Sequence, residues 1–255
     1  MTDFIRLRAV WRAFFAISAF GLLTACAAAP EVSGVNDPLE NTNRAVHAFN
    51  RGVDQVAVRP ASQVYGNVVP GPIQLGIANF SSNLGLPSAI INNALQGDLE
   101  SAALNTGRFL VNTTFGLGGI LDPSTELGVP EREADFGQTL HVWGVGEGAY
   151  VELPLLGPST TRDTAGTVVD FFLDPVGNVL DAREARYVRG AGIGSGLSAR
   201  YRFTDTIDSV LYDSADSYAQ ARLIYLQNRR FELGQETTES GVDTQGDLYD
   251  DLYLE

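Results

Sequence analysis

The sequence contains no lysine, a single cysteine and only two histidines among its 255 residues. All 17 basic residues are therefore arginine, and 31 acidic residues bring the formal net charge to −14. This balance argues against binding to nucleic acid through phosphate neutralisation, because that mode needs basic patches. One cysteine excludes an internal disulfide and a multi-cysteine zinc cluster. Two histidines leave little scope for a metal site.

The sequence also lacks an apolar run long enough to cross a bilayer. Its first apolar run is the eleven-residue segment Ala13–Leu23, which follows Arg6, Arg8 and Arg12. A short apolar core behind a basic segment is typical of a secretory signal peptide, which we place at residues 1–25. The mean hydropathy of the whole chain is near zero, so it is neither a polytopic membrane protein nor disordered throughout.

The lone cysteine lies directly after this segment, in the string Leu23-Thr24-Ala25-Cys26. The string is typical of a bacterial lipobox, in which the cysteine becomes the first residue of the mature chain and carries acyl chains. We therefore predict lipid attachment at Cys26, and no other cofactor. Several acyl chains anchor a protein stably where one does not. Ala27 in place of aspartate favours the outer membrane, with the protein facing the periplasm.

The rest of the chain divides by composition into three parts. Residues 26–35 are expected to be an acylated tether, and residues 36–233 a helical domain. Residues 234–255 are expected to be an acidic, disordered tail, since 232–255 hold eight acids and no base. A short docking motif in this tail is the alternative to a merely solvated tail.

Within the helical domain, no charged residue occurs between Arg59 and Asp98. The prolines in this stretch predict two short uncharged helices with a break at Pro87. Such helices suit a segment that dips into one leaflet, because lipid penalises charge. A helical hairpin in the core of a soluble protein is the alternative interpretation. Asn79 and Asn83, four residues apart, form a neutral polar stripe on this segment.

Further helices are predicted from caps and periodicity, with starts at Asp37, Asp98, Ser159 or Thr160, and Thr204. The first helix should fray before Arg59-Pro60, and the last should run to Leu233 and be closed by Gly234. The string Leu153–Pro158 is expected to be an extended link. Trp143 and Tyr150 suit a membrane interface.

Arg108 falls on the apolar side of the helix that Asp98 starts, and it therefore needs a partner. An acid, a backbone carbonyl and a lipid phosphate are the three candidates. The commoner solutions are an acid or a side-chain stem that carries the charge to the surface. The glycine string Gly116-Leu117-Gly118-Gly119 should end this helix.

Signals for catalysis are weak. No G-x-S-x-G elbow is present, and the glycines of 190–196 fail both the GxGxxG and the P-loop spacing. His47 and His141 are expected to be packing or interfacial residues. Carboxylate pairs such as Glu131/Glu133 are expected to lie on the solvated surface. No metal-ligand spacing occurs. The sequence therefore predicts a protein that is not an enzyme.

A series of short strings in one order links residues 36–233 to a known family. The strings are Asn36-Asp37-Pro38-Leu39-Glu40, Asn43-Arg44, Phe49-Asn50, Arg59-Pro60, Val69-Pro70, Asn79-Phe80, Asn83-Leu84, Leu95-Gln96-Gly97-Asp98, Arg108-Phe109, Asn112-Thr113, Gly116-Leu117-Gly118-Gly119, Phe136-Gly137-Gln138-Thr139-Leu140, Gly144-Val145-Gly146, Leu153-Pro154, Arg162-Asp163 and Asp174-Pro175. In these strings the chain resembles the MlaA (VacJ) lipoproteins of Gram-negative outer membranes. It departs from them at Thr42, where a bulky aromatic residue is expected.

This resemblance implies a mainly α fold, a compact ring-like helical domain lying in the inner leaflet of the outer membrane, with short Gly/Pro-rich connections. It implies that mislocalised phospholipids leave the outer leaflet through an amphipathic pore and reach a soluble periplasmic carrier of the MlaC type, which preserves lipid asymmetry. It also implies association with a trimeric porin. An outer-membrane lipid hydrolase and a structural porin-associated lipoprotein remain the alternatives.

The resemblance and the polar stripe together suggest residues for these roles. The lipid path is expected to include Asn79, Asn83, Arg108, Gly116, Gly118 and Gly119. Thr42 and Asn43 lie in the region that the family uses in gating.

Overall fold

The computed structural model describes residues 35–181 and 183–235. The predicted signal peptide, Cys26, nearly all of the predicted tether and nearly all of the acidic tail lie outside the described residues. The elements are, in order, α2 (Glu40–Val53), η2 (Asp54–Val58), α3 (Arg59–Val68), α4 (Gly71–Gln96), α5 (Leu99–Thr114), α6 (Pro123–Glu126), α7 (Phe136–Val142), β1 (Tyr150–Leu153), β2 (Gly157–Thr160), α8 (Thr161–Leu173), α9 (Pro175–Val179), α10 (Glu184–Arg202), α11 (Thr204–Asp208), η3 (Ser209–Asp213) and α12 (Ser217–Glu232).

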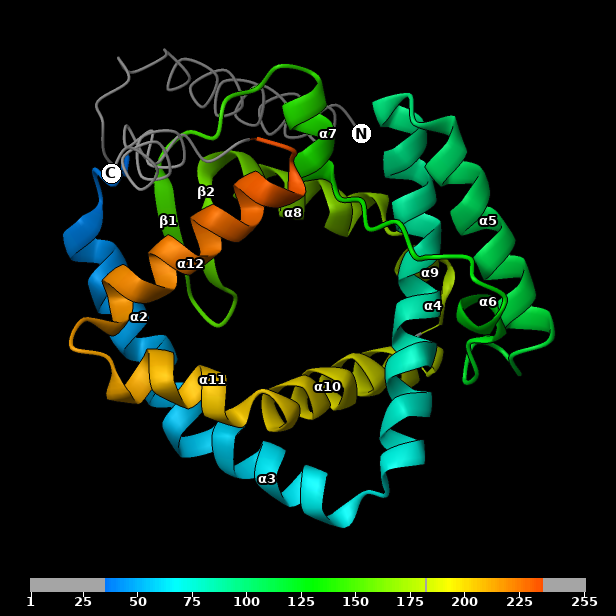
Figure 1. Ribbon diagram of the computed structural model, residues 1–255, viewed down its shortest axis with the longest axis horizontal. Coiled ribbons are helices and arrows are strands. Elements are labelled where there is room, and N and C mark those ends of the chain that lie inside the picture. The colour runs from blue at the N-terminus through cyan, green and yellow to red at the C-terminus, as the bar shows by residue number, and fades with distance from the viewer. Residues whose placement is uncertain (1–34, 182, 236–255) are drawn as a thin grey trace, which may run out of the picture.

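These elements follow one another around a central opening, so the described chain forms a ring (Figure 1). The helices α2 and α3 run along the left and lower edges, α4 forms the right side, and α5 lies outside it. The helices α7 and α8 and the β1–β2 hairpin form the upper part, and α12 runs from the side of α2 towards α7. Neighbours pack in pairs, α3 with α10, α4 with α5 and α10, and α7 with α8. The mainly helical, ring-like fold expected from the sequence is confirmed.

Several helix starts are set by side-chain caps. The Asp98 carboxylate accepts the backbone N–H of Ser101 at the start of α5, and the Thr160 hydroxyl accepts that of Asp163 at the start of α8. The sequence predicted the first cap, and for the second it left Ser159 and Thr160 as alternatives, of which the structure uses Thr160. Both caps satisfy backbone donors that have no partner within the helix.

The first helix departs from its prediction at both ends. It begins at Glu40, and Asp37 caps nothing, because its carboxylate accepts from Asn43, Tyr218 and Arg222 instead. The helix does not fray before Arg59-Pro60 either. A π-helical turn, η2, leads directly into α3, so the chain stays helical through Pro60, the second residue of α3.

The uncharged stretch forms one helix rather than two. The 26 residues of α4 run from Gly71 to Gln96 with Pro87 inside. An interior proline costs about 3 kcal/mol locally. Here α4 packs against α5, α7, α9 and α10, and this tertiary packing outweighs the local preference. Among the helices of residues 35–181 and 183–235, none combines the length and the apolar character that crossing a membrane requires.

Two further predictions, the helix 204–233 and the extended link, are also corrected. The expected helix 204–233 is interrupted at residues 214–216, where Ser214 is extended, and Asp216 caps α12 anew. The glycine-rich string 190–196 lies inside the helix α10. The expected extended link is the turn of an antiparallel hairpin, in which Tyr150 pairs with Thr160 and Leu153 with Gly157.

Candidate functional site

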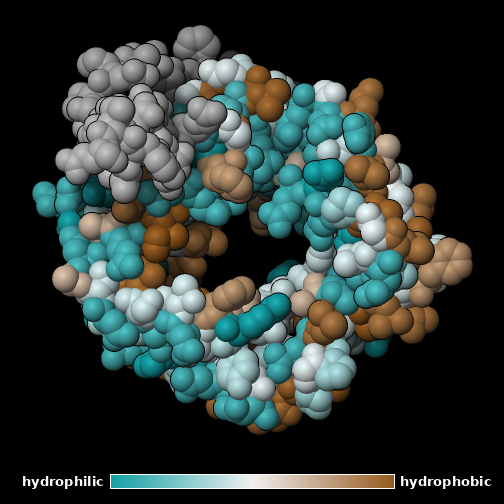
Figure 2. Space-filling model, viewed as in Figure 1, coloured by the Kyte–Doolittle hydropathy of each residue, from teal (hydrophilic) through white to brown (hydrophobic). Residues whose placement is uncertain are grey.

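The described residues bury polar side chains and expose apolar ones. Six hydrophobic residues are buried, against twenty-one polar or charged residues. Large apolar side chains are instead exposed over most helices, among them Val56, Phe115, Leu127, Phe171 and Phe231. Figure 2 shows hydrophobic side chains gathered along the right-hand outer edge of the ring, the side of α4 and α5 in Figure 1. A surface this apolar marks contact with a membrane or another protein.

The centre of the ring is a hollow that passes through the molecule in this view (Figure 2). Hydrophilic side chains border it over much of its circumference, and a hydrophobic group borders it on the left. The candidate functional site is this opening, because it combines polar and apolar walls within a molecule that exposes many large apolar side chains.

Arg108 lies on α5 and is only 3% exposed. Its guanidinium donates to Asp122 at 2.9 Å, to the Thr125 hydroxyl at 3.2 Å and to the Val129 carbonyl, and Glu131 lies 3.8 Å away. Of the three partners considered from the sequence, the structure therefore supplies an acid and a carbonyl. Burial raises the pKa of Asp122, but the hydrogen bonds from Thr125, Asn112 and Arg108 hold that pKa below its ordinary value.

Asn79 and Asn83 connect α4 to the end of α5 and the glycine turn that follows it. Asn79 donates to the Ile120 carbonyl at 3.2 Å, and Asn83 to the Thr113 hydroxyl at 3.1 Å. Asn83 is buried, and its side-chain oxygen has no hydrogen-bond partner. Both amides therefore bind other parts of the same chain. The four-residue spacing of the two asparagines in the sequence does not reveal these partners.

The glycine turn packs tightly against these asparagines. Gly118 and Gly119 have left-handed φ angles of 77° and 94°. A Cβ on Gly119 would lie 2.5 Å from the Asn83 side chain, and one on Gly116 would meet the Asn112 and Leu121 carbonyls. Glycine is thus required here for close approach of the turn to α4.

The residues placed in the gating region have different surroundings. Thr42 is exposed. Asn43 is 2% exposed and binds the β1 backbone, since its amide donates to the Tyr150 carbonyl at 3.1 Å and accepts the Glu152 N–H at 3.0 Å. Asn43 therefore holds α2 against the hairpin. The sequence indicated the position of Asn43 but gave no sign of this contact, because its partner lies more than 100 residues away.

His47 lies at the centre of a buried polar network. Its Nδ1 is 3.3 Å from Glu152 Oε1, and its Nε2 is 3.1 Å from the Ser217 hydroxyl. Tyr150 donates to the same glutamate and is 1% exposed. Tyr150 is therefore a core residue, and its predicted place at a membrane interface is wrong. Trp143 is 54% exposed and donates to the Leu95 carbonyl.

The Ser217–His47–Glu152 order has the hydrogen bonds of a hydrolytic triad. The three residues are between 3% and 9% exposed, so the hydroxyl is shielded from a substrate. The two cavities described for the molecule are lined by other residues. His141 lies elsewhere, and burial together with the charges of Arg162 and Arg229 lowers its pKa.

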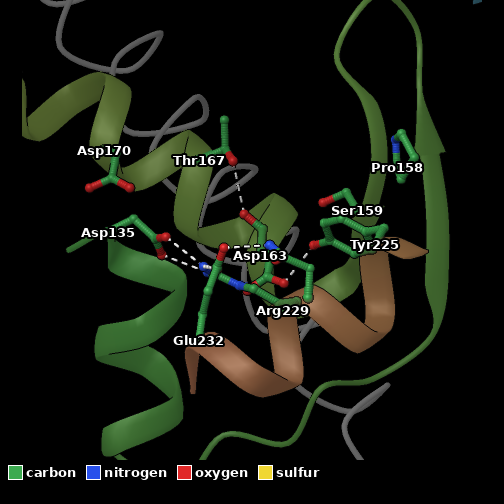
Figure 3. Close-up of a pocket in the computed structure, with 10 residues that line it drawn as sticks. Asp135, Pro158, Ser159, Asp163, Thr167, Asp170, Tyr225, Arg229 and Glu232 are labelled. Atoms are coloured by element: carbon green, nitrogen blue, oxygen red, sulfur yellow. Dashed lines mark hydrogen bonds and ion pairs between the residues drawn. The ribbon is translucent and has the colours of Figure 1, made fainter. Parts of the chain in front are cut away.

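Arg229 ties α12 to α7 and α8 beside a cavity of about 260 Å³ (Figure 3). Its guanidinium donates to Asp135 at 2.8 Å, to Asp163 at 3.0 Å and to Glu232 at 3.1 Å. Burial raises the pKa of Asp163, but the hydrogen bonds and charge of Arg229 more than offset it and hold that pKa below its ordinary value. Tyr225 belongs to the same network, since its hydroxyl donates to Asp163. These contacts join three parts of the ring.

The described chain offers no cluster of three or more His, Cys, Asp and Glu side chains suited to a metal ion. A second hollow, of about 360 Å³, lies between α5 and α6 and is lined mostly by apolar side chains. Neither hollow has the arrangement of nucleophile, base and open pocket that catalysis needs.

Comparison with known proteins agrees with this geometry. The family model for MlaA lipoprotein matches residues 35–232. The chain is 35% identical over 218 residues to a protein of Escherichia coli named "Intermembrane phospholipid transport system lipoprotein MlaA", covering 82% of this chain and 84% of that protein. A Haemophilus influenzae protein of the same name is 33% identical over 241 residues, covering 91% and 93%. These relatives are named as transport lipoproteins, not as enzymes.

A solved structure described as "Structural basis for maintenance of bacterial outer membrane lipid asymmetry" superposes with a TM-score of 0.67 at 34% identity. The match covers 77% of this chain and 98% of the solved one. The family model and the relatives each span most of the described residues. The chain therefore belongs to the MlaA lipoprotein family.

Proposed function

We propose that this protein removes mislocalised phospholipids from the outer leaflet of the outer membrane through the opening of its ring. The lipids pass to a soluble periplasmic carrier of the MlaC type, and outer-membrane lipid asymmetry is maintained. The names of its relatives support a role in intermembrane phospholipid transport, and the description of the similar structure supports a role in lipid asymmetry.

The observation that carries the proposal is the inverted distribution of side chains around an opening. Exposed apolar residues on the outer edge suit burial in one leaflet, where they lose contact with water. The opening has both polar and apolar walls, which a phospholipid with its headgroup and acyl chains requires. The ring would lie in the inner leaflet, anchored by acyl chains on Cys26, with a trimeric porin as its neighbour in the membrane.

The test is the amount of phospholipid exposed on the surface of intact cells, measured with a labelling reagent that does not enter the cell. A strain lacking the protein should show more label than the wild type, and the gene supplied in trans should restore the low level. An unchanged level in the deletion strain would refute transport and favour the structural porin-associated role. A Cys26→Ala variant should fail to complement, because it loses the anchor.

The triad-like order of Ser217, His47 and Glu152 gives the lipid hydrolase a specific test. We expect Ser217→Ala to clear surface phospholipid as well as the wild type does. It removes one hydrogen bond to His47 and should lower the free energy of unfolding by about 1 kcal/mol. Thermal unfolding and surface labelling measure the two effects separately. A variant that is present at the normal level and folded, but clears no lipid, would favour hydrolysis.

The polar stripe on α4 is tested at Asn79, which is partly exposed. We expect Asn79→Leu to impair lipid clearance while the protein stays anchored, because a neutral polar group would be lost from the proposed lipid path. It would also break the bond to the Ile120 carbonyl. Asn79→Gln, which keeps the amide, is the control and should retain most of the clearance. Equal clearance by Asn79→Leu and the wild type would remove Asn79 from the path.

A further inference from the structure

The turn of the β1–β2 hairpin carries two exposed leucines. Leu155 and Leu156 are each 70% exposed. Leu155 also has a φ of 65°, in the left-handed region that residues other than glycine, asparagine and aspartate rarely adopt. Turn chemistry therefore favours glycine or asparagine at this position, and contact with water favours a polar residue. Leucine satisfies neither preference, which points to another constraint on the turn.

The turn projects into the opening of the ring. In Figure 1 the connection between β1 and β2 extends from the upper left into the central space, beyond α12. In Figure 2 the left border of the opening is its hydrophobic part. The segment that carries the two leucines therefore reaches the central space on the side where the border of the opening is hydrophobic.

Two asparagines on α2 fix the hairpin in this position. Asn43 binds the backbone of Tyr150 and Glu152, as described above. Asn50 repeats the arrangement one step further along, since its amide donates to the Leu153 carbonyl at 3.0 Å and accepts the Leu155 N–H at 2.7 Å. Asn50 therefore holds the residue with the left-handed backbone.

The spacing of the two asparagines matches that of their targets. Seven residues of α-helix advance by about 10.5 Å. The backbone segments that they bind are three residues apart on the hairpin, which is about 10 Å of strand. The helix α2 is thus bonded to the hairpin backbone at two levels, the second of which includes the turn residue Leu155.

From this geometry we infer that the Pro154–Leu156 turn is the acyl-chain contact of the opening, and that Asn50 is the positioning residue that sets it. The inference rests on the proposed function and assigns the apolar part of the lipid path. Leu155 and Leu156 contact the acyl chains of a phospholipid in transit. This contact compensates for placing two leucines where the isolated turn would favour polar residues.

The first experiment separates folding from lipid contact. The double variant Leu155→Asn/Leu156→Asn suits the left-handed turn better than leucine does, so its thermal midpoint should equal or exceed that of the wild type. Its surface phospholipid label should nevertheless rise towards that of the deletion strain. The control, Leu155→Met/Leu156→Met, keeps the turn apolar and should clear lipid normally.

The outcomes distinguish this inference from the function on which it rests. If the deletion strain shows no excess label, the proposed function fails. If the deletion strain shows it but the asparagine double variant clears lipid like the wild type, only the acyl-chain contact is overturned. Asn50→Ala should give intermediate label, and Asn50→Gln should not restore clearance, because the longer side chain cannot keep both backbone bonds.

A second experiment detects the contact itself. Trp11 lies in the predicted signal peptide, so Trp143→Phe combined with Leu156→Trp leaves one tryptophan in the processed protein. Reconstituted into vesicles of phospholipid with brominated acyl chains, this variant should lose much of its fluorescence, while iodide in the buffer should quench it weakly. Strong quenching by iodide with none by the brominated lipid would show a water-filled opening at the turn and overturn the inference.

Discussion

An Arg229→Met variant is expected to lose about 3–5 kcal/mol of its free energy of unfolding, the range for breaking a buried ion pair by removing one partner. Arg229 is 8% exposed and donates to both Asp135 and Asp163 (Figure 3). Methionine fills similar space, so the loss reflects charge and hydrogen bonding. Asp163 would stay 8% exposed, with Arg162 as its remaining ion-pair partner among the described residues. The ring would be weakened where α12 meets α7 and α8.

The deficit of this variant should depend on pH. In the wild type the pKa of Asp163 lies below its ordinary value, so the carboxylate contributes stability that is present above about pH 4 and is lost as the pH falls further. Without Arg229, burial is opposed by Arg162 and by the hydroxyls of Tyr225 and Thr160, and the pKa of Asp163 should rise. Its protonated form is then favoured in the folded state, which lowers stability as the pH increases through that raised pKa. The gap between wild type and variant should therefore narrow on acidification.

The measurement is the thermal or denaturant unfolding midpoint in detergent between pH 4 and pH 8. Arg44→Met is the matched control, because Arg44 also bridges to α12, at Asp216, but its side chain is 40% exposed. Exposed ion pairs contribute little, so Arg44→Met should hardly shift the midpoint. Similar midpoints for the two variants, or a gap that widens at low pH, would contradict the assigned role of Arg229.

The sequence predicted best those features whose causes are local. Asp98 and Thr160 cap helices through backbone groups three residues away, and that spacing is visible in the sequence. Asp37 looked like a cap by the same rule, but its carboxylate binds Tyr218 and Arg222 about 180 residues later. Local rules cannot rank these competing partners. The continuous α4 was missed for the same reason, since packing of its faces overrides Pro87.

In the helix expected between Asp37 and Arg59, the sequence shows Val46, Phe49, Val53 and Val56 on one face, but not what surrounds that face. Phe49 and Val56 are 53% and 80% exposed, while Asn43 and His47 of the same stretch are buried. Periodicity shows that a helix has two faces, and only the surroundings decide which of them faces inward. In a ring with a polar interior the usual assignment is reversed. The hairpin was missed because Leu155 occupies a turn position for which the sequence signal is glycine or asparagine.

The sequence limited the partner of Arg108 to a few kinds of group but did not identify it. The substitution Asp122→Asn tests the partner that the structure supplies. Asp122→Asn should lower the free energy of unfolding by about 3 kcal/mol, at the low end for a broken buried pair because Glu131 remains 3.8 Å from the guanidinium. Asparagine still caps helices well, so the start of α6 should survive. Arg108 donates to one carboxylate oxygen and Asn112 to the other. A single amide oxygen cannot serve both, and one buried donor loses its acceptor.

A double variant isolates the charge. Arg108→Met/Asp122→Asn removes the buried guanidinium together with its partner, and should recover much of the stability lost by Asp122→Asn alone, because no unpaired charge remains buried. Unfolding midpoints of the two single variants and the double variant give the coupling between the residues. If Arg108 served chiefly to bind a lipid phosphate, Asp122→Asn would be nearly neutral for stability and Arg108→Met alone would abolish lipid clearance in a stable protein. If Arg108 instead serves the internal pair with Asp122, Asp122→Asn should be clearly destabilising, and any loss of lipid clearance should be explained by the lower stability.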